Sequence, residues 1–124
     1  MKNNFYENAA ATGTTAYHRI SQFVPLVATD GVAQMFLELK SFWIGDVVAS
    51  YLAKINRSGD FFQVTVVRGK SGGARFAVED GNGGKVLAQR IQYTDLLQDV
   101  KMFLAPIPYE GHKRGWVLML PSEY

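Results

Sequence analysis

The sequence predicts an α+β fold, in which two N-terminal helices pack on one face of a roughly five-stranded antiparallel meander sheet. Apolar residues recur at helical spacing up to about residue 55, and from Phe61 onward they alternate with polar residues at a period of two. The alternating segments are joined by short glycine-containing turns, which favour hairpins between neighbouring strands. Helices followed by hairpin-linked strands are typical of an α+β domain.

The first helix is predicted over residues 31–40 and the second over residues 42–55. Thr29-Asp30-Gly31 has the chemistry of a helix N-cap, and Ser41 stands at the corresponding place before the second helix. Gly45 lies inside the second apolar stripe, where glycine costs about 1 kcal/mol relative to alanine. We therefore expect a neighbouring element to approach the chain closely at Gly45.

Five strands are predicted in the second half of the chain. The first begins at Phe61, and the others cover about residues 74–79, 85–93, 101–105 and 115–120. The segment Glu79-Asp80-Gly81-Asn82-Gly83-Gly84 contains Asp-Gly and Asn-Gly, which are strong hairpin signals. Pro121 cannot donate a ladder hydrogen bond, so strand pairing should stop there, and we expect Tyr124 to be buried against the domain.

Composition limits the kinds of function. The chain has 124 residues, 48% of them hydrophobic, which suits one domain over residues 17–124 after a flexible arm over residues 1–16. The absence of cysteine excludes disulfides, thiolate metal sites and cysteine nucleophiles. With His18 and His112 far apart in sequence, we expect no metal and no cofactor. No signal peptide or membrane-length apolar run is visible, so we expect a cytoplasmic protein that does not bind membranes.

Gly69-Lys70-Ser71-Gly72-Gly73 includes the Gly-Lys-Ser of phosphate-binding loops. Such a loop needs another glycine separated by four residues from the Gly-Lys pair, and a helix after it, and neither is present here. The segment therefore predicts a hairpin turn, with basic side chains clustered around it.

Two loops and one helix position supply the candidate partner-binding residues. The formal net charge is only +2, so the sequence indicates local basic patches and not a broadly basic surface. Trp43 lies off the main helical stripe, and it either extends the core, which we favour, or anchors a partner. The residues assigned to partner binding are Arg68, Lys70, Arg75, Tyr109, His112, Lys113, Arg114 and Trp43.

Catalytic constellations are weak. The acid pairs Glu79–Asp80 and Asp95–Asp99 fall in expected turns, where solvated carboxylates are common. Thr94 and Asp95 are expected to cap a turn after the third strand. Tyr17-His18-Arg19 is better explained by a packed tyrosine and a surface pair than by a nucleophile–base system. We assign no catalytic residue.

Seven segments of the chain occur in a recognisable order. They are Tyr17-His18-Arg19, Thr29-Asp30-Gly31-Val32, Phe42-Trp43-Ile44-Gly45-Asp46, Glu79-Asp80-Gly81-Asn82-Gly83, Tyr93-Thr94-Asp95, Val117-Leu118-Met119 and Leu120-Pro121-Ser122-Glu123-Tyr124. Together they resemble a family of small bacterial proteins, with a domain of unknown function, that are often carried on phages and other mobile elements. The resemblance runs from about residue 12 to the end, and the last of these segments is its most specific piece. The chain departs from the family pattern at Leu96-Leu97-Gln98, where a proline-containing stretch is expected, and no activity is implied by the resemblance.

The leading functional hypothesis is a non-enzymatic inhibitor that covers the surface of a host protein. An anti-defence protein of the anti-CRISPR kind, acting on a CRISPR or other defence component, is its most concrete form. The alternatives are a nucleic-acid-binding protein that uses the basic loops and a small enzyme of unknown chemistry. Because a meander has two open edges, pairing with a second copy into a homodimer is a further expectation.

Overall fold

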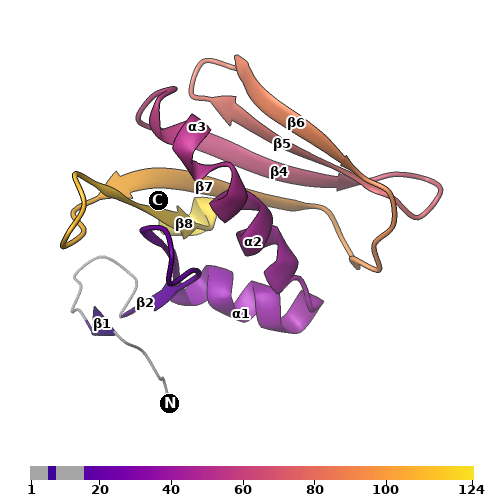
Figure 1. Cartoon of the computed structure of the whole chain (residues 1–124). Coiled ribbons are helices and arrows are strands. Elements are labelled where there is room, and N and C mark those ends of the chain that lie inside the picture. The colour runs from indigo at the N-terminus through magenta and orange to yellow at the C-terminus, as the bar shows by residue number, and fades with distance from the viewer. Residues whose placement is uncertain (1–5, 8–15) are drawn as a thin grey trace.

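The computed structural model describes residues 6–7 and 16–124, and within them the backbone forms one eight-stranded sheet (Figure 1). The strand order is β1-β2-β3-β8-β7-β4-β5-β6, and every neighbouring pair is antiparallel except β3 and β8. The strands are β1 (Tyr6–Glu7), β2 (Ala16–Arg19), β3 (Leu26–Thr29), β4 (Phe62–Arg68), β5 (Ala74–Asp80), β6 (Lys85–Ile91), β7 (Val100–Ile107) and β8 (Gly115–Met119).

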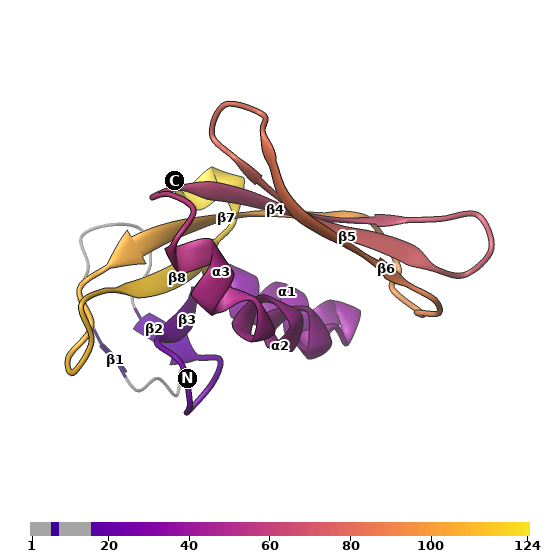
Figure 2. The ribbon, with the colours of Figure 1, turned by 45° about the horizontal axis from the view of Figure 1, so that its top comes forward.

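Among the described residues, three helices cover one face of this sheet. They are α1 (Asp30–Leu39), α2 (Phe42–Ser50) and α3 (Leu52–Asn56). Figure 2 shows them together on one side of the strands, while the short 3₁₀ helix η1 (Pro121–Glu123) lies on the other side. The hairpin formed by β5 and β6 extends beyond the helices, so part of the sheet has no helical cover (Figures 1 and 2).

The core forms between the helices and the inner face of the sheet. In β4, Phe62, Val64 and Val66 are fully buried and alternate with the half-buried Gln63 and Thr65. This alternation is what the period of two predicts for a strand with one covered face. Full burial of a large apolar side chain contributes about 1.5–3 kcal/mol, so the inner face supplies the main driving force for folding.

The predicted combination of helices and strands is confirmed, but the predicted arrangement of two N-terminal helices before a five-stranded meander is wrong. Three additional strands precede the helices, and β8 lies inside the sheet next to β3 and β7. All four residues of β3 are buried, so they show no alternation from which a strand could be recognised. A parallel pair covered on both faces has this continuous apolar character.

Most local predictions agree with the structure. The five predicted strands correspond to β4 to β8, and the helix predicted over residues 31–40 corresponds to α1. The second helix is interrupted at Tyr51, whose hydroxyl donates to Gln89 Oε1 at 2.6 Å and whose ring stacks on Phe76 with centroids 6.2 Å apart. These contacts orient Tyr51 toward the sheet.

The predicted close approach at Gly45 is also present. A Cβ at that position would lie 3.0 Å from Cγ2 of Ile20, in the β2–β3 loop, and 3.3 Å from Cε2 of Phe36 in α1. The glycine therefore lets α2 pack tightly against two elements. The prediction of a flexible arm over residues 1–16 falls mostly outside the described residues, and the described part places Tyr6 and Glu7 opposite Tyr17 and Ala16.

The predicted N-caps differ in outcome. The side chain of Thr29 accepts a hydrogen bond from the Val32 N–H at 3.3 Å, as a helix cap does. Ser41 makes no such bond: its hydroxyl is buried and has no hydrogen-bond partner among the described residues.

Glu123 anchors the C-terminal segment to the start of α1. Its Oε1 accepts hydrogen bonds from the Thr29 hydroxyl at 2.6 Å and the Leu120 N–H at 2.8 Å. Its Oε2 accepts from the Gly31 N–H at 3.1 Å, which places a negative charge at the N-terminus of the helix. The carboxylate thus satisfies backbone donors on two segments that are distant in sequence.

Tyr124 was expected to be buried, and this is wrong. Its side chain is 76% exposed and leans on Phe61 and Phe103, with ring centroids 5.2 and 5.5 Å away. The two phenylalanines lie on the face of the sheet opposite α1, α2 and α3, beside η1, and the ring rests on that surface. Glu123, and not Tyr124, holds this segment in place.

Replacement of Glu123 by alanine should lower the free energy of unfolding by about 2 kcal/mol, because three hydrogen bonds to a charged group are lost. Urea denaturation followed by circular dichroism measures the change. Glu110→Ala, in the exposed β7–β8 loop, is the matched control and should leave the unfolding free energy unchanged. Equal stability of the two variants would contradict the anchoring role.

Candidate basic interface

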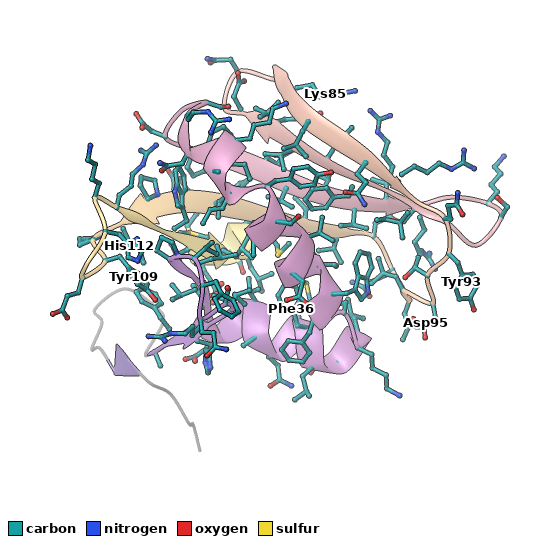
Figure 3. All side chains as sticks on the ribbon, in the orientation of Figure 1. Phe36, Lys85, Tyr93, Asp95, Tyr109 and His112 are labelled. Carbon is teal, nitrogen blue, oxygen red and sulfur yellow. The ribbon has the colours of Figure 1, made fainter. Side chains whose placement is uncertain are left out.

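The structure separates the predicted partner-binding residues into two groups. Figure 3 shows Tyr109 and His112 at one end of the sheet, and Tyr93 and Asp95 at the other, beside the β4–β5 turn that carries Lys70. Figure 1 places the β7–β8 loop and the β4–β5 turn at opposite ends as well. The two basic loops therefore cannot form one continuous patch.

Arg114, in the last loop, makes internal contacts. Its guanidinium donates to Asp60 Oδ1 at 2.7 Å, to Asn56 Oδ1 at 2.9 Å and to the backbone oxygens of Asn56 and Gly59 at 2.8 and 2.9 Å. Its Cζ also lies 4.4 Å from the ring centre of Trp116, a cation–π geometry. The side chain thus links the C-terminal end of α3 to the start of β8. Because these internal contacts occupy its guanidinium, we leave Arg114 out of the candidate interface.

Trp43 is half-buried and packs against the hydrophobic core, which agrees with the favoured prediction for this residue. In the last loop, His112 and Lys113 are exposed. The ring of Tyr109 packs on Gly115 and lies 5.5 Å from the His112 ring. This loop presents one lysine and one histidine to solvent, which is a small charge for an interface.

The β4–β5 turn is a hairpin turn, as predicted, and the adjoining loop braces it. The Gly69 N–H donates to the Gly73 oxygen at 2.8 Å, and Gly72 has a φ of 92°, which favours glycine. The Thr94 N–H donates to the Gly72 oxygen at 2.8 Å. Asp99 accepts the Arg68 N–H at 2.8 Å. These two bonds hold the loop between β6 and β7 against the turn.

Acidic residues from the two predicted pairs stabilise turns. Asp80 Oδ1 accepts the N–H groups of Asn82 and Gly84, both at 2.8 Å, and so stabilises the β5–β6 turn. The Thr94 hydroxyl oxygen accepts the Leu96 N–H at 3.1 Å, which is the predicted turn-capping contact. Asp99 also lies 3.7 Å from the Arg68 Nε, an exposed ion pair.

Arg75 and Arg90 form the most unusual arrangement in the structure. They stand directly opposite each other on β5 and β6, on the face that the helices leave open, and both are exposed. No ion pair joins either guanidinium to a carboxylate within residues 6–7 and 16–124. Like charges directly opposite each other destabilise a sheet, so this pair costs stability in the isolated protein.

The two arginines line an open groove of about 620 Å³. Val67, which is 48% exposed, and Ala88 supply its apolar part, and Arg68 stands at its end beside the turn. We call the groove formed by Val67, Arg68, Arg75, Ala88 and Arg90 the basic groove. Lys70 lies exposed in the adjoining turn. Arg68 and Arg75 were predicted from the sequence, whereas Arg90 was not.

The residues considered for catalysis do not converge. His18 Nε2 lies 2.7 Å from Asp30 Oδ1, where β2 meets the start of α1, whereas Asp95 and Asp99 lie in the loop beside the β4–β5 turn. Within the described part of the chain, no three His, Cys, Asp or Glu side chains form a cluster that could hold a metal ion. No helix there is long and apolar enough to cross a membrane.

A comparison with protein families assigns the chain. Residues 6–124 match a family described as "Family of unknown function (DUF6876)". The chain belongs to this family. The resemblance seen in the sequence is thereby confirmed at the level of a domain of unknown function. No curated protein and no solved structure matches the chain.

Replacement of Arg114 by alanine should lower the free energy of unfolding by about 2 kcal/mol, because four hydrogen bonds are lost, partly in contact with solvent. Arg114→Lys should recover little of this, since a single ammonium cannot reach the acceptors that the planar guanidinium contacts together. Thermal denaturation of both variants checks the expectation. Lys113→Ala is the adjacent control, and a loss of stability there as large as in Arg114→Ala would contradict it.

Proposed function

We propose that this protein is a small non-enzymatic binding protein that inhibits a partner protein by covering an acidic part of its surface with the basic groove. The observation that carries the proposal is the directly opposed pair Arg75 and Arg90, which lacks a carboxylate partner in the described residues. An acidic partner would supply the missing counter-charge. The repulsion within the free protein would then become attraction within the complex.

The character of the basic groove suits a protein surface. Arginine is enriched at the energetic centres of protein interfaces, where its planar group binds carboxylates through two hydrogen bonds. Val67 and Ala88 add apolar surface between the charges, as protein interfaces do. The open shape of the groove suits an extended or convex segment of a partner.

Nucleic acid is the alternative partner for the same charges. It is supported by the exposed ring of Tyr93, which approaches Gly72 in the turn and could stack on a base. Three observations favour the protein partner. The net charge is only +2, Arg68 is already paired with Asp99, and the basic loops lie at opposite ends of the sheet. A nucleic-acid surface would normally carry a continuous basic track.

The more specific form of the proposal is an anti-defence inhibitor, encoded by a phage or other mobile element, that acts in the cytoplasm on a CRISPR or other defence component. Its support is the small size of the chain and the resemblance described above. An interference assay tests it: a bacterium whose CRISPR system targets a plasmid should accept that plasmid when it expresses the protein. Unchanged rejection of the plasmid would contradict inhibition of that system.

The double variant Arg75→Glu/Arg90→Glu should lose the partner. Affinity purification from a bacterial lysate with wild-type and variant protein compares what each retains. An acidic protein should be retained by the wild type and bound at least about tenfold more weakly by the variant, a difference of about 1.4 kcal/mol. The same complex should weaken as salt is raised, because exposed charges are screened.

Lys113→Glu is the matched control, since it places a charge reversal at the opposite end of the sheet and should retain the partner. If no protein distinguishes the wild type from the double variant, the basic groove is not the binding surface. Fluorescence anisotropy with a labelled single-stranded oligonucleotide provides the competing measurement. Tight binding that is lost in the double variant would replace the protein partner with nucleic acid.

A further inference from the structure

We propose that β6 accepts an extended acidic segment of the partner protein as an added strand of the sheet. The inference rests on the proposed function, because it assumes that the partner of the basic groove is an acidic protein. It concerns a different part of the molecule, namely the backbone edge of β6 beside the groove.

The first step is that β6 is the edge strand. It is the last strand in the sheet order and pairs with β5 alone among the described strands. It also belongs to the hairpin that extends beyond the helices, so no helix lies along it (Figures 1 and 2). An uncovered edge presents backbone N–H and C=O groups that can pair with another chain.

The second step identifies which backbone groups face outward. In an antiparallel ladder, hydrogen-bonded and non-hydrogen-bonded pairs alternate. The hydrogen bond from the Gly69 N–H to the Gly73 oxygen identifies Gly69 and Gly73 as a hydrogen-bonded pair. Arg75 lies two residues further along, so its backbone N–H and C=O groups also form hydrogen bonds with β4. Its neighbours Ala74 and Phe76 then bond toward β6, where they face Ile91 and Gln89.

It follows that the backbone groups of Ala88 and Arg90 point away from β5. The β5–β6 turn supports this assignment. The Asp80 N–H donates to the Gly84 oxygen at 2.8 Å, so the backbone of Asp80 points toward β6. Asp80 is an even number of residues from Ala74, so the backbone of Ala74 points the same way. Ala88 and Arg90 therefore offer N–H and C=O groups to an added strand. Their side chains also line the basic groove, so the edge and the groove form one surface.

The third step is the identity of the added strand. Lys85 and Arg90 stand near the two ends of β6, and both are exposed. A second copy of β6 would bring these positive charges together, which opposes pairing of two copies of this chain. A segment with carboxylates would instead place a counter-charge beside Arg90. The charges of β6 thus select an acidic strand.

The register irregularity in β6 limits where the strand can add. The pairing with β5 shifts between Val78 and Glu79, so Val86 is the extra residue on β6. A bulge twists the edge and interrupts regular pairing. The straight part of the edge therefore runs from Leu87 to Ile91, which is enough for a short segment that contacts Ala88 and Arg90.

Ala88→Pro tests the inference directly. Proline at this position removes one outward N–H without removing a bond to β5, and edge strands tolerate it there. The probe is a fluorescein-labelled peptide with alternating valine and glutamate, and its binding is measured by fluorescence anisotropy. We expect the wild type to bind the peptide and Ala88→Pro to bind it at least about tenfold more weakly. Lys113→Ala, in the exposed β7–β8 loop at the opposite end of the sheet, lies outside the basic groove and should bind like the wild type.

A modified peptide gives the same test on the unchanged protein. The peptide with N-methyl groups on alternate residues keeps its charge but cannot pair as a strand, and it should bind at least about tenfold more weakly. In amide NMR spectra of the wild type, the peptide should protect the N–H groups of Ala88 and Arg90 from exchange, while those of Leu87 and Gln89 are already protected by β5. These readouts do not depend on the folding of a variant.

The outcomes separate the inference from the proposed function. If both peptides bind wild type and Ala88→Pro alike, and Arg75→Glu/Arg90→Glu abolishes binding, then strand addition is overturned and charge-driven binding stands. Failure of the wild type to bind the valine–glutamate peptide overturns strand addition, and the affinity purification then decides the proposed function alone. A wild-type dimer in light scattering that Ala88→Pro converts to a monomer would make a second copy the occupant and overturn the acidic strand.

Discussion

The parallel pairing of β3 with β8 is the constraint on which the rest of the fold depends. It places Leu26 beside Trp116 and Ala28 beside Leu118 in the centre of the sheet, joining the first three strands to the last five. Because α1 begins directly after β3, this pairing also positions the helices over the core. Glu123 reinforces the arrangement by binding the first residues of α1. The parallel pairing therefore fixes where α1 begins relative to the middle of the sheet.

The parts of the fold that the sequence predicts are those determined by local periodicity. The helices over 31–40 and 42–55 and the strands β4 to β7 follow from the spacing of apolar residues, because one face of each is covered. In β8, by contrast, four consecutive residues are buried. The parallel pair could not be predicted in this way. β3 has four residues, all buried, and a short apolar run of this kind is compatible with a strand or with part of a helix. The interior position of β8 follows from that unpredicted partner.

The candidate interface shows the same limit. Arg114 is in the densest basic cluster of the sequence, but sequence density does not tell where a side chain points, and its acceptor Asn56 is 58 positions away. Arg90 stands alone in the sequence among apolar and amide residues. Its place in the basic groove depends on Arg75, which stands opposite it on β5. The register that pairs the two arginines follows from the Asp80–Gly84 turn and the bulge at Val86. Cross-strand pairs of this kind are invisible without the register.

The central position of β8 has a consequence for biosynthesis. Thr29 and Glu123 are 94 positions apart, and β3 must wait for β8 to be synthesised before it can pair. The ribosome adds about 5 to 20 residues per second, so the apolar edge of β3 stays open for several seconds in the nascent chain. Contacts between such distant segments form slowly, because closing the long loop costs entropy before any contact repays it. The nascent chain is therefore most prone to wrong strand pairing, and most dependent on chaperones, in the interval before β8 leaves the ribosome.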